Sequence, residues 1–344
     1  MYRRIIRPLL FLIPPETTHH IIVFIVRIAF RIPGMKQILK KTYAVEDKRL
    51  NREIFGLKFT NPIGLAAGFD KNAGFFNEFM VFGFGFIEIG TVTPVGQAGN
   101  PKQRLFRIPR DQGLINRMGF NNLGLDKAID KLKNKPEGLI IGGNIGKNTS
   151  TSNEKAVEDY ARCFEGLYPY VDYFVVNVSC PNICDLNELQ DKELLIGILI
   201  RLADIRSSMT IKKPILVKIS PDLNFQQIDD VLELISQTGM DGIVATNTTI
   251  KRENLATGAK MIEQIGNGGL SGKPLRQRST EIIKYISEKT NGKLTIIGTG
   301  GIMSPEDAIE KIRAGASLIQ IYTGFIYEGP CIVKKINKVL SEKL

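Results

Sequence analysis

Three side chains that can move a proton or hold a polar ligand lie within six residues of one another: Asn177, Cys180 and Asn182. An Asn amide carries two donors and an acceptor, so it can hold a planar polar ligand. A Cys thiol has a reference pKa of about 8.5, which makes Cys180 a candidate general base near neutral pH. The same residues also fit an Asx turn around a small buried thiol. Whether they form a reaction centre or such a turn depends on the elements that surround them.

The elements that would position these side chains begin after Leu50, where short apolar runs start to alternate with helical stretches. The candidate strands are 63–66, 86–90, 139–144, 173–177, 215–219, 242–246, 294–298 and 318–322. Helical patterns cover 72–81, 156–167, 192–208, 225–238, 280–290 and 305–314. This alternation favours an α/β fold, a parallel (β/α)8 TIM barrel, over a doubly wound sheet. A small hairpin at 54–59 is expected to cap the barrel.

Glycine, amide, hydroxyl or amine groups follow all eight candidate strands, at the end where such barrels carry their active sites. Gly300-Gly301 and Tyr322-Thr323-Gly324, after the last two strands, offer unobstructed backbone N–H groups that suit a phosphate. A cation at Lys218 could stabilise negative charge on a reduced ring. One phosphate site and one buried Lys predict FMN rather than a dinucleotide, because no GxGxxG motif follows a strand.

The remaining polar groups describe a substrate. Lys71 supplies a positive charge, Asn116, Asn177, Asn182 and Asn247 supply amides, and Thr248 supplies a hydroxyl. The segment 116–120 lies in a long insertion after the second strand and is expected to fold over the barrel mouth, although a plain polar turn is the alternative. Four amides and one cation suit a small planar anion with imide edges and a carboxylate.

Positive charge is concentrated at the start of the chain. Residues 1–41 carry eight Lys and Arg side chains against the single Glu16, a net charge of +7 out of +11 for all 344 residues. Such asymmetry points to an anionic partner surface, either nucleic acid or lipid. The basic residues alternate with Ile, Leu and Phe and no nucleic-acid motif is present, so lipid is favoured.

Residues 1–41 are expected to form a helical hairpin that is separate from a catalytic barrel at 45–344. Pro14-Pro15 ends the first helix, and the second runs from about 16 to 32 with Thr17 or Thr18 as a possible N-cap. The apolar run 21–30 would span only about half of a ~30 Å hydrocarbon core. We therefore expect helices that lie in a membrane interface, the alternative being helices that pack on the barrel or on a second copy of it.

Cysteine and histidine usage narrows the chemistry further. Four Cys in a chain of this length do not make a disulfide framework, so a reducing compartment is favoured. The only two histidines, His19 and His20, lie in the N-terminal segment, which excludes a His general base in the barrel and leaves no metal site expected.

Several motifs together resemble the dihydroorotate dehydrogenase family over about residues 50–330. They read AAGFDK (66–71), IEIGTVTP (87–94), GLINRMGFNNLG (113–124), GNIGKN (143–148), VNVSCPN (176–182), ATNTT (245–249), GGLSGKPL (268–275), IIGTGGI (296–302) and IQIYTGF (319–325). The N-terminal hairpin is similar to that of the membrane-associated, quinone-reducing class (class 2). The resemblance implies a flavoprotein oxidoreductase of pyrimidine biosynthesis that oxidises (S)-dihydroorotate to orotate: a base removes the C5 proton, flavin N5 takes hydride from C6, and a quinone entering between the N-terminal helices reoxidises the flavin.

Site residues carry over from the matching motifs. The resemblance implies cofactor contacts from Ala67, Gly68, Phe69, Asp70, Lys71, Thr91, Asn144, Asn177, Lys218, Thr246, Gly272, Gly301, Tyr322 and Thr323. It implies substrate contacts from Lys71, Asn116, Arg117, Met118, Gly119, Phe120, Asn177, Asn182, Asn247 and Thr248. The base position falls on Cys180. The implied location is the cytoplasmic side of the cell membrane, as a peripheral protein.

The base position departs from the pattern of the class. Membrane-associated members usually have Ser there, whereas Cys is typical of the soluble classes, and the following 183–187 also differ from the usual Thr-Pro-Gly-Leu-Arg. The electron acceptor therefore has an alternative, a soluble-type enzyme that uses fumarate or a partner reductase with NAD. The N-terminal extension favours quinone, because a quinone needs an apolar entrance and the soluble classes lack that extension.

We predict that Cys180→Ala abolishes proton abstraction while flavin binding is retained. Cys180→Ser should keep some activity but move the rate-limiting ionisation to higher pH, because a hydroxyl is a much weaker acid than a thiol. The pH profile of turnover, measured for both variants and the parent chain, checks this. Near-normal turnover of the Ala variant would remove the thiol from the role of base.

Overall fold

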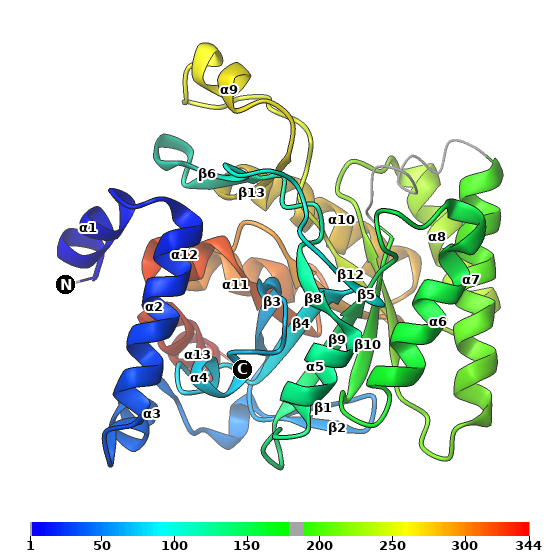
Figure 1. The fold of residues 1–344 in the computed structure, drawn as a ribbon, viewed down its shortest axis with the longest axis horizontal. Helices are drawn as coiled ribbons and strands as arrows, with labels where there is room; N and C mark the ends of the chain where they lie inside the picture. The colour runs from blue at the N-terminus through cyan, green and yellow to red at the C-terminus, as the bar shows by residue number, and fades with distance from the viewer. Residues whose placement is uncertain (1, 179–188, 344) are drawn as a thin grey trace.

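Eight runs of mainly β-branched and apolar residues form the strands of a closed parallel barrel. The computed structural model describes residues 2–178 and 189–343. The barrel strands are β3 (Ile63–Asp70), β4 (Phe86–Val92), β9 (Ile140–Ile145), β10 (Tyr173–Asn177), β11 (Ile215–Ile219), β12 (Gly242–Ala245), β14 (Thr295–Thr299) and β15 (Leu318–Ile321). They close in the order β10-β11-β12-β14-β15-β3-β4-β9 (Figure 1). The predicted TIM barrel is confirmed, and a doubly wound sheet is excluded because the sheet has no free edge.

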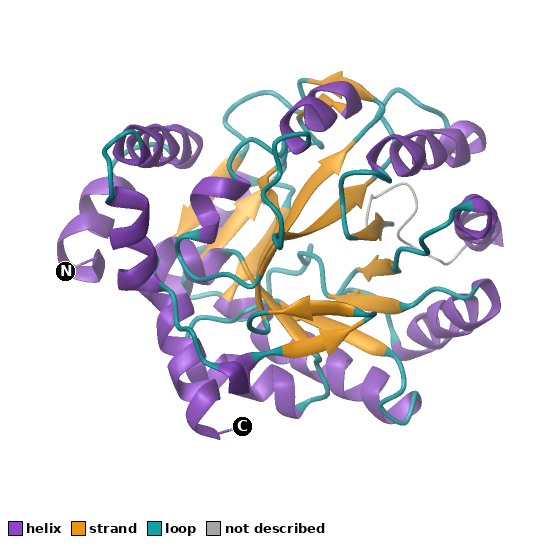
Figure 2. Ribbon diagram, turned by 90° about the horizontal axis from the view of Figure 1, so that it is seen from below, coloured by secondary structure: helices purple, strands orange, loops and turns teal. Residues whose placement is uncertain are grey.

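Helices surround the strands on the outside of the barrel (Figure 2). They are α4 (Phe76–Met80), α5 (Leu125–Leu132), α6 (Ala156–Leu167), α7 (Leu189–Ser208), α8 (Phe225–Thr238), α10 (Arg276–Lys289), α11 (Pro305–Arg313), α12 (Thr323–Glu328) and α13 (Cys331–Lys343), with short 3-10 turns at Lys48–Leu50, Pro109–Asp111, Asn153–Lys155 and Lys273–Leu275. α8 has the bounds that its pattern predicts, because an Asn224/Gln227 capping box starts it and left-handed Gly239 ends it.

The interior of the barrel is apolar at its amino-terminal end. Large side chains such as Phe86, Tyr173 and Leu216 are fully buried there and form one cluster. The hairpin of β1 (Arg52–Ile54) and β2 (Leu57–Phe59) packs against this cluster through Phe59 and its neighbours, which confirms that it caps the barrel. Functional polar groups are therefore left to the opposite, carboxyl end.

Additional strands lie over that carboxyl end. β6 (Leu105–Ile108), β7 (Gly113–Asn116) and β13 (Gly269–Gly272) form one antiparallel sheet, and β5 (Val95–Gln97) pairs with β8 (Asn122–Gly124). A short helix, α9 (Ala259–Ile265), projects beyond them (Figure 1). The sequence pattern did not identify these strands, because three- and four-residue strands carry too little periodicity to be recognised.

The N-terminal segment forms three helices and one π-helical turn instead of a simple hairpin. These are the turn Tyr2–Ile6, α1 (Arg7–Phe11), α2 (Pro15–Phe30) and α3 (Met35–Tyr43). The expectation that Thr17 or Thr18 caps the second helix is wrong, because the helix already begins at Pro15, a residue well suited to a first helical position. The Thr18 hydroxyl instead donates toward backbone carbonyls that include Pro14 O and accepts from Arg107 Nη2 at 3.0 Å.

Ion pairs attach this segment to one flank of the barrel. Glu16 on α2 pairs with the buried Arg104 at 3.0 Å, and Arg27 pairs with Glu78 on α4 at 3.0 Å. In Figure 1 the segment lies beside α4, α12 and α13. Within the described part of the chain, no helix combines the length and the hydropathy needed to cross a bilayer.

Candidate active site

A large cavity, about 1440 Å³ in volume, lies at the carboxyl end of the barrel. Residues from the ends of the strands line it together with the β6–β7–β13 sheet. The predicted site residues that line it are Ala67, Gly68, Lys71, Thr91, Asn116, Arg117, Met118, Gly119, Phe120, Asn177, Lys218, Thr246, Asn247, Thr248, Gly272, Gly301, Tyr322 and Thr323. The structure thus brings together side chains that lie up to about 250 positions apart in the sequence.

Five other predicted site residues either do not line the cavity or lie outside the described part of the chain. Cys180 and Asn182 lie outside the described residues, directly after the end of β10. Asn144 is fully buried beneath Thr91 rather than at the cavity surface. Phe69 and Asp70 have other partners: Phe69 packs among aromatic rings, and the buried Asp70 carboxylate accepts from Gly74 N and Phe75 N at 2.7 Å. These two residues stabilise the turn after β3 and are not part of the cavity lining.

A continuous line of hydrogen bonds runs from the barrel interior up to the cavity. Asn144 Nδ2 donates to Glu88 Oε1 at 2.8 Å, and the Thr91 hydroxyl donates to Asn144 Oδ1 at 2.5 Å. Asn177 Nδ2 donates to Thr91 Oγ1 at 2.9 Å, and Asn247 Nδ2 lies 3.4 Å from Asn177 Oδ1. Each donor in this line points toward the carboxylate at its lower end, so the cavity amides hold one fixed orientation.

Lys218 supplies the positive charge at the floor of the cavity. It is the fourth residue of β11 and only 6% exposed, and its ammonium lies 3.5 Å from Glu88 Oε1. A buried ammonium of this kind stabilises negative charge that develops on a ligand above it. Together with the line of amides, it gives the floor one cation and several oriented dipoles.

Glycines make room for close backbone approach at the other side of the cavity. A Cβ at Gly301 would lie 2.3 Å from the Cα of Arg276, and Gly301 has a φ of +74°. A Cβ at Gly324 would lie 2.1 Å from Ile302 O. Gly272, with a φ of +97°, is equally confined. These positions admit only glycine, and they present backbone where the sequence predicts a phosphate.

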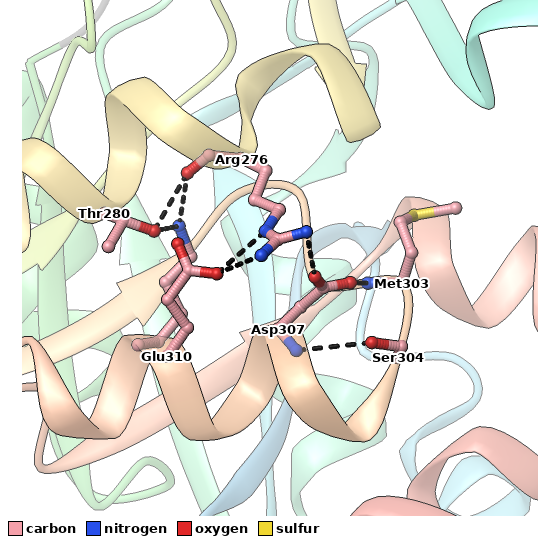
Figure 3. Close-up of polar contacts among 7 residues, drawn as sticks. Arg276, Thr280, Met303, Ser304, Asp307 and Glu310 are labelled. Carbon is pink, nitrogen blue, oxygen red and sulfur yellow. Dashed lines mark hydrogen bonds and ion pairs between the residues drawn. The ribbon is translucent and has the colours of Figure 1, made fainter.

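A network of charged side chains fixes the loop that contains Gly301 (Figure 3). Arg276, at the start of α10, pairs with Asp307 at 2.9 Å and donates from Nε to Glu310 at 2.9 Å, both on α11. Asp307 also accepts from Met303 N at 2.9 Å, which ties the loop to the helix. The fully buried Lys311 donates to Arg276 O at 2.7 Å, and burial lowers the pKa of its ammonium to about 7.

Lys71 brings a second cation to the cavity, near its mouth. Its ammonium donates to Asn121 Oδ1 at 2.5 Å. Burial, and then the charge of Arg104, lowers the pKa of Lys71 to about 8. The side chain is therefore protonated at neutral pH, but with a smaller margin than a surface lysine has.

Aromatic rings connect the cavity with α2. Tyr322 lines the cavity and lies edge-on to Phe69, with ring centroids 5.2 Å apart. Phe69 in turn contacts His19 of α2, again at 5.2 Å. Burial lowers the pKa of His19 to about 4, so its imidazole is neutral at physiological pH. Aromatic rings therefore connect α2 with the cavity wall.

Two buried polar residues of this site escaped the sequence analysis, namely Glu88 and Gln320. Both are essentially inaccessible and both point into the barrel, where Gln320 Nε2 donates to Glu88 Oε2 at 2.6 Å. The available signal was a charged or amide residue inside an otherwise apolar strand, which is costly unless it has partners. The partners that satisfy these two side chains lie on other strands, so the sequence alone does not show them.

Comparison with known proteins shows to which family the chain belongs. A family model described as dihydroorotate dehydrogenase matches residues 49–344. The chain belongs to the dihydroorotate dehydrogenase family. A dihydroorotate dehydrogenase (quinone) from Christiangramia forsetii is 54% identical over 343 residues, which cover 100% of this chain and 99% of the relative. A dihydroorotate dehydrogenase (quinone) from Thermosynechococcus vestitus is 47% identical, and the match covers 98% of this chain and 96% of that relative.

A solved structure agrees with the sequence relatives. The crystal structure of DHODH from Eimeria tenella in complex with ferulenol superposes with a TM-score of 0.82 at 35% identity, over 94% of this chain and 90% of that one. The dihydroorotate dehydrogenase family predicted from the motifs is therefore confirmed. The assignment of Cys180 as the base stays a prediction.

We predict that Gly301→Ala destabilises the fold by more than the left-handed backbone alone explains. Gly56→Ala is the matched control, because Gly56 has the same φ of +74° but no atom within 4 Å of the added Cβ. The control should lose about 1–2 kcal/mol of unfolding free energy, and Gly301→Ala should lose clearly more. Equal losses in urea unfolding would show that the contact with Arg276 does not confine this loop.

Proposed function

We propose that the protein oxidises (S)-dihydroorotate to orotate with FMN as prosthetic group and passes the electrons to a quinone, as a step of pyrimidine biosynthesis. The observation that carries the proposal is one cavity that combines buried Lys218, half-buried Lys71, oriented amides and glycine-confined backbone, in a chain whose relatives are named dihydroorotate dehydrogenase (quinone). The glycines and Lys218 suit a flavin, and the amides with Lys71 suit a planar anionic substrate.

The residues present fit FMN. Gly272, Gly301 and Gly324 line the cavity with backbone that carries no side chain, and close packing on neighbouring backbone holds each of them in place, which suits a phosphate held by backbone N–H groups. Lys218, Asn177 and Thr246 also line the cavity, where they would hold the ring. When bound, FMN supplies a two-electron acceptor for the oxidation of a carbon–carbon single bond.

The chain's own residues would bind the substrate and remove its proton. Lys71 pairs with the carboxylate of dihydroorotate, and the amides of Asn116, Asn177 and Asn247 bind the imide edges of its ring. We expect the Cys180 thiolate to remove the C5 proton. The Lys218 ammonium would stabilise negative charge on the flavin ring. Closure of the site by the β6–β7–β13 sheet keeps water away from this charge and strengthens each interaction.

The N-terminal helices supply the entrance for the quinone. His19 is neutral and lies against Phe69, which contacts Tyr322 at the cavity wall, so aromatic rings that an apolar acceptor could pack against lead from α2 toward the cavity. Arg107 donates to Ile13 O at 2.6 Å and places one polar group beside this path. An acceptor that enters here would reach the cavity without crossing the substrate opening.

The same helices dock the protein on the membrane that holds the quinone. Large apolar side chains are exposed on α1, on the residue that follows it and on α2, including Leu9 at 62%, Leu12 at 82% and Phe24 at 63% exposure. Arg and Lys side chains accompany them and suit anionic headgroups. We infer a peripheral location on the cytoplasmic side of the cell membrane.

Anaerobic mixing with dihydroorotate tests the proposed activity. The purified chain should be yellow, and the substrate should bleach its flavin absorbance. A quinone analogue should then restore the colour much faster than fumarate or NAD does. A colourless protein would overturn the cofactor, and fast reoxidation by fumarate or NAD would favour the soluble-type reaction instead.

Vesicles separate membrane docking from quinone use in the same assay. A long-chain quinone presented in anionic phospholipid vesicles should reoxidise the reduced protein faster than the same quinone in zwitterionic vesicles, and added salt should remove the difference. Equal rates in both kinds of vesicle would contradict the contact with anionic lipid. If a water-soluble quinone still reoxidised the protein, quinone use itself would stand.

We predict that orotate binding weakens above pH 8. Lys71 is charged below its pKa of about 8 and loses its charge above it, so the Kd for orotate should rise about tenfold per pH unit beyond that point. Lys71→Arg keeps its charge and should show a flat Kd up to at least one unit higher. A flavin difference spectrum measures both, and identical pH profiles would exclude Lys71 as the carboxylate partner.

A further inference from the structure

Glu88 is a buried carboxylate that the reaction described above does not use. It lies on β4, is 0% exposed, and does not belong to the cavity lining, so it touches neither substrate nor cofactor. A fully buried charge costs several kcal/mol of solvation unless partners compensate it. What Glu88 contacts therefore shows what it is for.

Three other barrel strands supply its partners. The Lys218 ammonium of β11 lies 3.5 Å from Oε1, and Asn144 of β9 donates to the same oxygen at 2.8 Å. Gln320 of β15 donates to Oε2 at 2.6 Å. Both carboxylate oxygens are used, and two of the partners, Lys218 and Gln320, line the cavity floor directly above.

The carboxylate also sets the direction of the amides above it. An ionised carboxylate only accepts, so Asn144 must present its Nδ2 to Glu88 and its Oδ1 to the Thr91 hydroxyl. That hydroxyl then donates downward and accepts from Asn177 Nδ2 at 2.9 Å. A neutral amide in place of Glu88 could present either its oxygen or its NH2 group to Asn144. The hydrogen bonds from Asn144 to Asn177 would then no longer have one fixed direction.

Stability alone does not explain this arrangement. Well-packed apolar residues are often as stable as a buried ion pair. The layer just below, with Phe86 and Tyr173, shows that this barrel packs apolar side chains in its interior. The polar layer appears only where the cavity begins.

We infer that Glu88 is the positioning residue of the cavity floor, whose carboxylate holds Lys218, Asn144 and Gln320 in place and offsets the positive charge of Lys218. The inference has two parts, the fixed geometry of the floor and the effect of Glu88 on a flavin above Lys218, and the second part rests on the proposed function. A lone ammonium would favour the reduced, anionic form of that ring, and the nearby carboxylate limits the preference. Glu88 thereby sets how easily the ring gives its electrons to the next acceptor.

A double-mutant cycle on the cofactor-free protein tests the first part. Glu88→Gln and Lys218→Met each leave one buried charge without its partner, so each should raise the unfolded fraction in urea by at least about 100-fold. The double variant has no buried charge there and should be much less destabilised than the sum of the two. Additive losses would overturn the pairing, and this readout needs neither FMN nor turnover.

The midpoint potential of the bound flavin tests the second part. Glu88→Gln should shift it to a more positive value, by about 30 mV for a tenfold preference for the reduced form in a two-electron couple. Asp111→Asn is the matched control: Asp111 is also a buried carboxylate, but it accepts hydrogen bonds from Ala256 N and Thr257 N and from no residue of the cavity floor, so a much smaller shift is expected.

The outcomes separate the inference from the proposed function. If the parent chain binds no FMN, the proposed cofactor fails while the urea cycle still decides the pairing. If it binds FMN and dihydroorotate bleaches it, but Glu88→Gln has the potential of the parent chain, the charge role of Glu88 is overturned. Should Glu88→Gln alone not fold, recovery of folding in the double variant supports the pairing. The potential is then compared between the double variant and Lys218→Met, which differ only at position 88. The double variant should have the more positive potential, and equal potentials would overturn the charge role.

Discussion

The buried pair of Glu88 and Lys218 is the interaction on which the polar half of the barrel depends. Its two charges lie 3.5 Å apart on strands β4 and β11, which are not neighbours in the sheet. Only a closed barrel brings such strands together across its interior, and only complete pairing makes two buried charges tolerable. The fold and the site are therefore coupled: barrel closure creates the pair, and the pair orients the amides from which the cavity floor is built.

Around this floor, each wall has a separate physical origin. Glycines that cannot accept a Cβ bring backbone close at one side, and the Arg276 network behind them keeps that backbone in place. The extra strands cover the mouth and contribute Asn116. The N-terminal helices approach from the flank, where Glu16 pairs with Arg104, and His19 of α2 contacts Phe69, which packs on Tyr322 at the cavity wall. The proposed quinone entrance lies on this flank, away from the sheet that covers the mouth.

Much of this follows from the sequence, because its signals are local. Apolar runs of four to six residues located all eight barrel strands, and the polar residues after them marked most of the cavity lining. Other features depend on contacts between distant segments. Asn144 reads as a cavity residue but lies beneath it, since its partner Glu88 is on another strand. Phe69 and Asp70 share a motif with Lys71, yet the turn after β3 directs them away from the cavity. The short strands of the covering sheet form only because β7 has β6 and β13 to pair with.

The central claim is that a carboxylate at the barrel interior fixes the direction of every amide between it and the substrate. Neutron diffraction from a perdeuterated crystal measures this most directly, because it distinguishes the nitrogen from the oxygen of each amide and shows each deuterium. The account predicts deuterons on Asn144 Nδ2 directed at Glu88, on Thr91 Oγ1 directed at Asn144, and on Asn177 Nδ2 directed at Thr91, with Glu88 carrying none. A deuteron on Glu88, or either amide in the reversed orientation, would contradict it.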